Sequence, residues 1–303
     1  MIEYLRTPDD QFQGLPGYDF APNYLEIPAG DGTSLRVHHL DEGPSDGPVV
    51  LLLHGEPSWS YLYRHMIPVL VNGGARCIAP DLVGFGRSDK PTQQSDYSFE
   101  GHVAWLTSHV LDALELKDIT MVGQDWGGML GLRLVAAHPE RFARVVVANT
   151  GLPDGTAPMT DAFLAWQNFA ATAEDFPVGV IVNGGSATDL SPEVIAAYDA
   201  PFPSDEYKAG ARVFPSLVPT STESPSAKEN GEAWATLRNF SKPVICAFSD
   251  ADPITKNGFK VFLREIAGAQ GRENITIEGG GHFLQEDRGP DLAAVVLDAL
   301  REH

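Results

Sequence analysis

The chain has 303 residues, and 43% of them are hydrophobic, which is enough to bury a large core and excludes a disordered chain. The formal net charge of −20, from 41 acidic against 21 basic side chains, argues against binding to nucleic acid or to a negatively charged membrane. Small neutral molecules remain open as partners.

Two features of the sequence indicate the cellular compartment in which the protein is found. The N-terminal segment MIEYLRTPDDQF has no basic stretch followed by an apolar run, and no stretch of about 18 uncharged apolar residues occurs elsewhere. Cys77 and Cys246 both lie in apolar runs, which favours buried free thiols over a disulfide. The sequence therefore predicts a soluble, cytoplasmic protein that does not associate with membranes.

The strand patterns begin with residues 25–43, which alternate around Gly30-Asp31-Gly32 and predict an antiparallel hairpin at a sheet edge. Uninterrupted apolar runs, typical of strands buried on both faces of a parallel sheet, follow at 49–55, 77–81, 119–125, 144–151, 243–250 and 275–282. Helix-compatible stretches at 102–116 and 127–142 separate some of these runs. The alternation indicates an α/β fold with a mostly parallel sheet flanked by helices.

The alternation of strand and helix patterns stops after Asn149. Residues 153–230 are rich in Pro, Ala and Phe, with short helical pieces and no strong strand, and the strand pattern resumes at 243–250. We expect residues 1–152 and 231–303 to form one core domain and residues 153–230 to form an inserted helical cap. In such folds ligands bind outside the carboxyl ends of the strands, where the cap would close over them.

The segment MVGQDWGG, residues 121–128, predicts a strand, a tight turn and a helix. Asp125 occupies the place that Ser holds in the G-x-S-x-G nucleophile elbow of α/β-hydrolases. The glycines at 123, 127 and 128 suit a strained turn and a close helix crossing. The alternative is that Asp125 only caps the helix, because Asp is a favoured N-cap residue.

Two later motifs favour the catalytic interpretation. Gly281-His282 follows the last strand pattern, where α/β-hydrolases place their general base. The segment FSDADPIT offers Asp252 to orient that imidazole, with Asp250 as its rival. We prefer Asp252 because it precedes Pro253-Ile254, whereas Asp250 is better placed to cap or turn. The order Asp125, Asp252, His282 is nucleophile, acid, base.

The strand at 49–53 ends in His54-Gly55-Glu56-Pro57, a loop that in α/β-hydrolases donates one backbone N–H to the oxyanion hole. The second donor is the N–H of the residue after the nucleophile, so we expect an oxyanion hole formed by Glu56 and Trp126. Each donor is typically worth about 3–4 kcal/mol in the transition state. A cis bond before Pro57 is accessible, because proline reduces its cost.

An aspartate nucleophile has chemical consequences. A carboxylate is already ionised near neutral pH and can displace a stable anion from a saturated carbon, which forms an ester that water activated by His282 can cleave. The indole N–H of Trp126 is a donor on an apolar ring and can hold the departing anion in a dry pocket. The alternative is that Trp126 is simply part of the core.

These motifs, HGEPSWSYLYR, DLVGFGRSDKP, QDWGG, FSDADPIT and GGGHFLQED, resemble the haloalkane dehalogenase family, particularly its first subfamily. The resemblance covers nearly the whole chain, including AAYDAPFPSDEYKAGARVFP in the expected cap. It implies an α/β-hydrolase fold and the hydrolysis of a haloalkane to a primary alcohol, a halide ion and a proton through an alkyl ester of Asp125. No cofactor is implied, and we expect a monomer whose partners are substrate, water and halide.

The resemblance also implies roles for individual side chains. Trp166, in FLAWQNF, matches a second halide-binding tryptophan, and Glu56 is placed near the hydrolytic water. Met129 stands where family members often carry an aromatic residue, which affects pocket width. The side chains expected around the alkyl group are Phe163, Phe169, Phe214 and Pro215.

Three other functions are compatible with parts of these motifs. An epoxide hydrolase also uses an aspartate followed by Trp but protonates an alkoxide, usually with cap tyrosines, for which Tyr198 and Tyr207 are available. Glu56 in the HGEP loop and Trp166 argue against this alternative. A fluoroacetate-type dehalogenase needs cationic groups beside Asp125, and the sequence indicates none there. A silent ligand-binding protein of this fold is expected to lose part of the triad, which is complete here.

A metal site is not expected, although the chain has nine histidines. None falls in an H-E-x-x-H motif, and His38 and His39 alternate to opposite faces of a strand.

Overall fold

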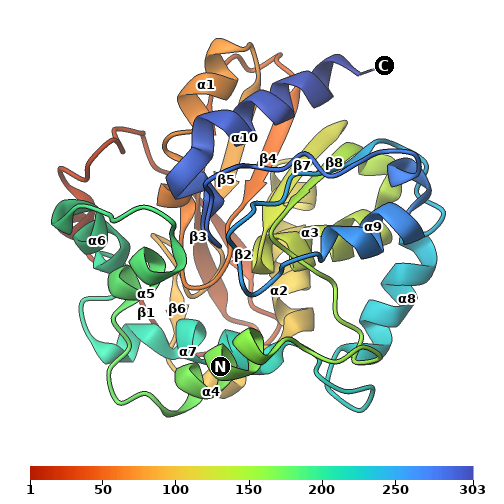
Figure 1. Ribbon diagram of the computed structural model, residues 1–303. Coiled ribbons are helices and arrows are strands. Elements are labelled where there is room, and N and C mark those ends of the chain that lie inside the picture. Colours follow the sequence, from red (N-terminus) through yellow and green to blue (C-terminus); the bar gives the residue numbers. More distant parts are fainter. Residues whose placement is uncertain (303) are drawn as a thin grey trace.

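Seven strands form the central sheet of the computed structural model, which describes residues 1–302 (Figure 1). Their order is β2 (Asn23–Pro28), β3 (Ser34–Glu42), β5 (Arg76–Pro80), β4 (Val49–Leu53), β7 (Ile119–Gln124), β8 (Phe142–Ala148) and β9 (Val244–Cys246). The hairpin of β2 and β3 is antiparallel, and β3 joins β5 antiparallel; the remaining neighbours are parallel. The predicted mostly parallel sheet with an antiparallel hairpin at its edge is confirmed.

The last predicted strand, at 275–282, forms only in part. The amides of Ile275 and Ile277 donate to the carbonyls of Cys246 (2.9 Å) and Phe248 (3.0 Å), so this segment pairs beside β9. The pairing is an isolated parallel bridge between Ser249 and Ile277. Gly279, with φ of 73°, then turns the chain toward His282.

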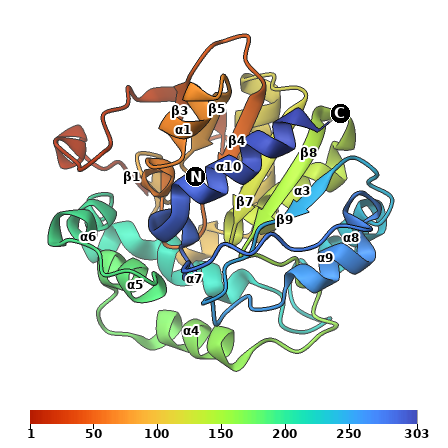
Figure 2. The ribbon, with the colours of Figure 1, turned by 45° about the horizontal axis from the view of Figure 1, so that its top comes forward.

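Helices cover both faces of the sheet (Figure 2). On one side α1 (Ile67–Asn72) packs against α10 (Leu284–Arg301), and on the other α3 (Trp126–Ala137) packs against α2 (Phe99–Leu106) and α8 (Ala227–Leu237). A π-helical segment, Thr107–Ala113, continues α2, and α9 (Phe259–Glu265) lies beside β9. A separate ladder pairs β1 (Tyr4–Leu5) with β6 (Lys90–Pro91). Short 3-10 helices occur at Asp9–Phe12, Ser60–Tyr63, Gln94–Asp96, Pro139–Arg141, Asp205–Lys208 and Ala267–Ala269.

Four helices lie together on one side of the molecule, α4 (Asp161–Thr172), α5 (Val178–Gly185), α6 (Pro192–Asp199) and α7 (Ala209–Leu217), as both views show (Figures 1 and 2). This agrees with the helical character expected of residues 153–230. The expected boundary at residue 230 falls inside α8, which packs against α3. The division into core and cap remains a prediction.

Local signals explain where these helices begin. The hydroxyl of Thr160 accepts from the amide of Phe163 (3.2 Å) and caps α4, and Ser191 caps α6 through the amide of Val194 (3.4 Å). Pro192 occupies the first turn of α6, where its missing N–H costs no hydrogen bond.

Cys77 and Cys246 are buried and unpaired, so the prediction of free thiols is confirmed. Within residues 1–302, no helix combines the length and the apolar character needed to span a membrane.

Candidate active site

Asp125 lies in the turn between β7 and α3 with φ of 51° and ψ of −126°, a conformation that costs an aspartate of order 1–3 kcal/mol. The turn is closely packed, because a Cβ atom at Gly127 would collide with the backbone of Leu53 and one at Gly128 with the side chain of Thr150. The Thr150 hydroxyl also donates to the carbonyl of Asp125 (2.6 Å). These contacts hold the carboxylate at the carboxyl end of the sheet.

The Asp125 side chain does not cap α3. Its Oδ1 instead accepts from the backbone amide of Glu56, at 2.8 Å. The capping interpretation of Asp125 therefore fails, and the carboxylate faces the loop after β4.

The structure brings Asp125, His282 and Asp252 together at the ends of three strand segments. Nε2 of His282 lies 3.5 Å from Oδ2 of Asp125, and Nδ1 lies 3.1 Å from Oδ2 of Asp252. The imidazole is nearly enclosed, with 5% of its side chain exposed. This geometry allows His282 to receive a proton at Nε2 while Asp252 fixes Nδ1–H.

The two candidate acids occupy different environments. Asp252 is buried and accepts hydrogen bonds from the amide of Ile254 (2.8 Å) and from Thr255. Asp250 instead accepts from the amide of Gly279 (2.8 Å) and closes a turn. The geometry favours Asp252 as the partner of His282.

The charges around His282 shift both pKa values. Burial lowers the pKa of His282, but Asp252 and Asp125 outweigh it and raise the value to about 10. Burial raises the pKa of Asp252, but the imidazole and the Thr255 hydroxyl outweigh it and lower the value to about 2. In the ligand-free protein the imidazole is therefore held in its charged form between two carboxylates.

Glu56 places its backbone amide on Asp125 and its side chain in the site. The residue is 4% exposed, and Oε1 of its carboxyl has no hydrogen-bond partner. Burial and the neighbouring Asp125 raise the pKa of Glu56 well above its usual range, although His282 and Trp166 act in the opposite direction. The Glu56-Pro57 bond is cis.

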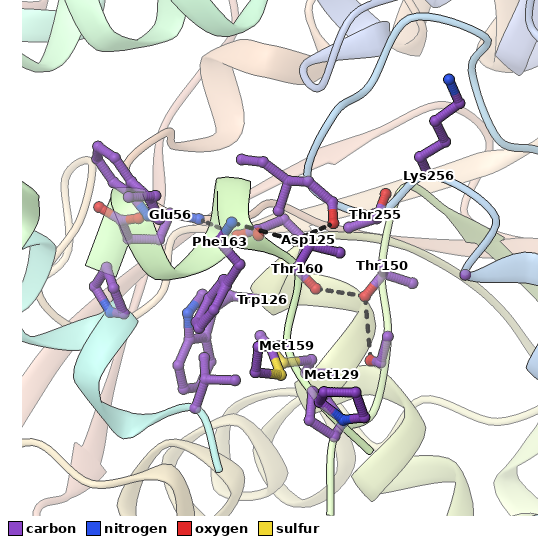
Figure 3. Close-up of a pocket in the computed structure, with 18 residues that line it drawn as sticks. Glu56, Asp125, Trp126, Met129, Thr150, Met159, Thr160, Phe163, Thr255 and Lys256 are labelled. Atoms are coloured by element: carbon purple, nitrogen blue, oxygen red, sulfur yellow. Dashed lines mark hydrogen bonds between the residues drawn. The ribbon is translucent and has the colours of Figure 1, made fainter. Parts of the chain in front are cut away.

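A mostly apolar cavity of about 200 Å³ opens beside Asp125 (Figure 3). Its lining combines the groups around the nucleophile with apolar side chains of the helices above the sheet. Of the residues expected there, the structure places Glu56, Asp125, Trp126, Phe163, Trp166 and Pro215 on its wall, together with Met129.

The five tryptophans fall into two groups. The indole N–H groups of Trp59, Trp105 and Trp234 donate to backbone carbonyls of Ala197, Ala29 and Leu152, at 3.2, 3.1 and 2.7 Å. Within residues 1–302, those of Trp126 and Trp166 donate to no protein acceptor, and both residues line the cavity. Two indole donors are thus available for a ligand next to Asp125.

Two of the aromatic residues expected around the alkyl group lie elsewhere. Phe214 is fully buried and packs against Trp126, with ring centroids 4.5 Å apart, so it supports the cavity wall from behind. Its neighbour Pro215 takes the lining position because successive helical residues point about 100° apart. Phe169 is 41% exposed, stacks on Trp166 one turn along α4, and lines an adjoining cavity whose wall does not include Asp125.

The cavity wall lacks the tyrosine and cationic groups that the alternative activities are expected to use beside Asp125. Neither Tyr198 nor Tyr207 lines it, and the Tyr198 hydroxyl donates to Glu286 (2.8 Å). Lys256 does line it, as a cation that the sequence did not indicate. Figure 3 shows its ammonium directed away from Asp125, so it is not placed to hold a substrate carboxylate against the nucleophile.

Two residues that hold the backbone at His282 were not predicted from the sequence. The side-chain amide of Gln124 donates to the carbonyl of His282 (3.1 Å), and that of Asn149 donates to the carbonyls of Gly281 (2.8 Å) and His282 (3.1 Å). Gln124 is the last residue of β7 and Asn149 directly follows β8, at the sheet edge where ligands bind, and this position was the only available signal.

Comparison with known proteins agrees with this geometry. The family model described as alpha/beta hydrolase fold matches residues 48–289. A haloalkane dehalogenase of Psychrobacter cryohalolentis is 50% identical over 302 residues, which cover 100% of this chain and 99% of that protein. The chain belongs to the haloalkane dehalogenase family.

Other haloalkane dehalogenases are similar over the same length. That of Mycolicibacterium paratuberculosis is 48% identical over 98% of both chains. The solved structure of a haloalkane dehalogenase from Paraglaciecola agarilytica NO2, described as tetrameric, has a TM-score of 0.88 and 37% identity and covers 97% of both chains. The predicted fold, family and enzyme class, a hydrolase acting on carbon–halide bonds, are confirmed.

Proposed function

We propose that this chain hydrolyses the carbon–halogen bond of small haloalkanes to a primary alcohol, a halide ion and a proton, with Asp125 as nucleophile. One observation carries the proposal: Asp125 shares an apolar cavity with the only two indole N–H groups, within residues 1–302, that donate to no protein acceptor. A carboxylate beside two free donors in a dry pocket suits displacement of an anion from a saturated carbon.

In the first step a carboxylate oxygen of Asp125 attacks the halogen-bearing carbon. The cavity of about 200 Å³ admits only a small alkyl chain, which Phe163 and Pro215 would contact. The halide departs opposite the attacking oxygen, where the indole N–H groups of Trp126 and Trp166 would hold it. The product is an alkyl ester of Asp125.

In the second step His282 takes a proton from water, and the hydroxide attacks the carboxylate carbon of Asp125. The amide of Glu56 already lies 2.8 Å from Oδ1 of Asp125, so it is in place to donate to the oxyanion, with the amide of Trp126 as the second donor. Asp252 stabilises the imidazolium that forms.

Ester formation also prepares His282 for this role. It removes the negative charge of Asp125, which is one of two carboxylates that raise the pKa of the imidazole. The pKa of His282 therefore falls when the ester forms, and the proton is lost before water is activated.

Bromide release from 1-bromobutane and 1,2-dibromoethane tests the proposal. We expect the wild type to turn over both substrates and Asp125→Asn to lose at least about a thousandfold in kcat. Asp112→Asn, at an exposed position of the π-helical segment, is the matched control and should be unaffected. Undiminished multiple turnover by a correctly folded Asp125→Asn variant would contradict the nucleophile.

The proposed molecule is a cytoplasmic monomer. Buried free thiols support the cytoplasmic location. The oligomeric state needs a direct test, because one relative is described as tetrameric. Light scattering during size-exclusion chromatography distinguishes a mass near 32.7 kDa from a multiple of it.

A further inference from the structure

The two steps above use the backbone amide of Glu56 but no proton of its side chain, for which the family resemblance implies only a place near the hydrolytic water. Its carboxyl is buried, lines the cavity with Asp125, and has one oxygen, Oε1, without a partner. Within residues 1–302, no Lys or Arg forms an ion pair with it, and the positive charge that acts on it is that of His282. A buried carboxyl with no cationic partner of this kind, beside a second carboxylate, is most stable in its neutral form.

The position of Glu56 relates it to the leaving group. Glu56 and Trp166 line both the cavity beside Asp125 and an adjoining cavity of about 300 Å³, so the two side chains share the wall between them. Figure 3 draws Glu56 and Trp126 on the same side of Asp125. Glu56 therefore shares this cavity with the indole donors that mark where a leaving group departs.

We infer that Glu56 is a proton donor to the leaving group and gives this site a second activity, the hydrolysis of small terminal epoxides. The inference rests on the proposed role of Asp125 as nucleophile. A halide leaves without a proton, whereas the alkoxide of an opened epoxide is strongly basic and needs one. Neither Tyr198 nor Tyr207 lines the cavity, and Lys256 points away from Asp125, so Glu56 is the neutral acid on the wall for that transfer.

The proposed reaction balances without a further reactant. Asp125 attacks the terminal ring carbon, the carbon–oxygen bond breaks with its electron pair on oxygen, and that oxygen takes the proton of Glu56. The hydroxyalkyl ester is then cleaved by water through His282, whose gained proton goes to the second departing oxygen. The remaining proton of the water ends on Asp125 and returns through solvent to Glu56, so that epoxide and water give a diol.

The test compares two reactions in a His282→Phe background, where esters of Asp125 accumulate. Intact-protein mass spectrometry follows the butyl ester from 1-bromobutane and the hydroxybutyl ester from 1,2-epoxybutane in separate single-turnover reactions. We expect Glu56→Gln, which keeps the size but carries no transferable proton, to lower the ratio of epoxide to bromide reaction rates at least about a hundredfold. Glu56→Asp, which keeps the acid, should restore part of that ratio.

Each other outcome has a defined meaning. A ratio that changes less than about threefold in Glu56→Gln, including equal loss of both reactions, would show that Glu56 is not the acid. If the butyl ester forms but no hydroxybutyl ester does, and the wild type releases bromide without making diol, the second activity is absent while the dehalogenase proposal stands. If no butyl ester forms at all, the nucleophile assignment fails and this inference fails with it.

Discussion

Nε2 of His282 lies 3.5 Å from Oδ2 of Asp125, so the two groups assigned to successive steps are already neighbours in the ligand-free protein. Alkylation of Asp125 breaks this ion pair and exposes the ester to the base that cleaves it. The ion pair therefore stabilises the ligand-free protein with His282 charged, and its loss on alkylation allows His282 to become the neutral base that catalysis needs.

The raised pKa of His282 predicts a specific pH dependence of stability. A folded-state pKa of about 10 against an ordinary value of 6.5 means that the stabilisation is complete below pH 6.5 and is lost as pH rises toward 10. We expect the free energy of unfolding to fall by at most about 1.4 kcal/mol per pH unit in that window because of this group. Urea titrations between pH 6.5 and 10 should show a smaller slope for His282→Gln, and an equal slope would contradict the assignment.

Replacing the base should separate the two chemical steps. His282→Phe removes the group that activates water but leaves Asp125 and the indole donors, so one equivalent of bromide should be released from 1-bromobutane, followed by arrest. Intact-protein mass should increase by one butyl group, located on the peptide that contains Asp125. Continued turnover by this variant, or an unmodified mass after the bromide burst, would show that His282 does not act on an ester.

The two free indole donors predict that halide ions change tryptophan fluorescence. Chloride or bromide should quench the intrinsic emission of the wild type, and Trp166→Phe should weaken halide affinity by about tenfold or more, since a charge-assisted hydrogen bond contributes about 1.5–3 kcal/mol. Trp234→Phe is the matched control because its indole donates to Leu152. A loss of halide affinity equal in both variants would rule out a site specific to Trp166.

The two aspartates after β9 should differ in importance. Asp252→Asn removes the charge that stabilises the imidazolium, and hydrolysis of the ester should slow by up to about 10⁴-fold, as for the comparable change in a Ser-His-Asp triad. Asp250→Asn disturbs only a turn and should retain most of the activity. Rapid-quench measurement of the bromide burst should remain within a few fold in both, and the opposite ranking would favour Asp250 as the acid.

Much of the catalytic geometry follows from strand order alone. Asp125, Asp252 and His282 follow strand patterns, and parallel strands present their carboxyl ends at one edge, so their approach could be predicted from the sequence. The position of the Glu56 amide next to Asp125 could be predicted in the same way, because Glu56 follows β4 and β4 lies beside β7.

The cavity wall was harder to predict because it depends on the rotation of each short helix. Phe214 and Pro215 are adjacent in α7, yet only Pro215 faces the cavity, and no local signal sets that rotation. Gln124 and Asn149 act on His282 over sequence separations of 158 and 133 residues, which only the folded sheet brings together.

The central claim is that Asp125 forms an ester that water cleaves at the carboxylate carbon. A single turnover with excess enzyme and 1-bromobutane in water labelled with oxygen-18 tests it directly, by mass spectrometry of the Asp125 peptide and of the alcohol. The account predicts that the label enters the Asp125 carboxylate and that the first butanol formed is unlabelled. Label in the butanol, with none in the Asp125 peptide, would show that water attacks the substrate directly and would contradict the account.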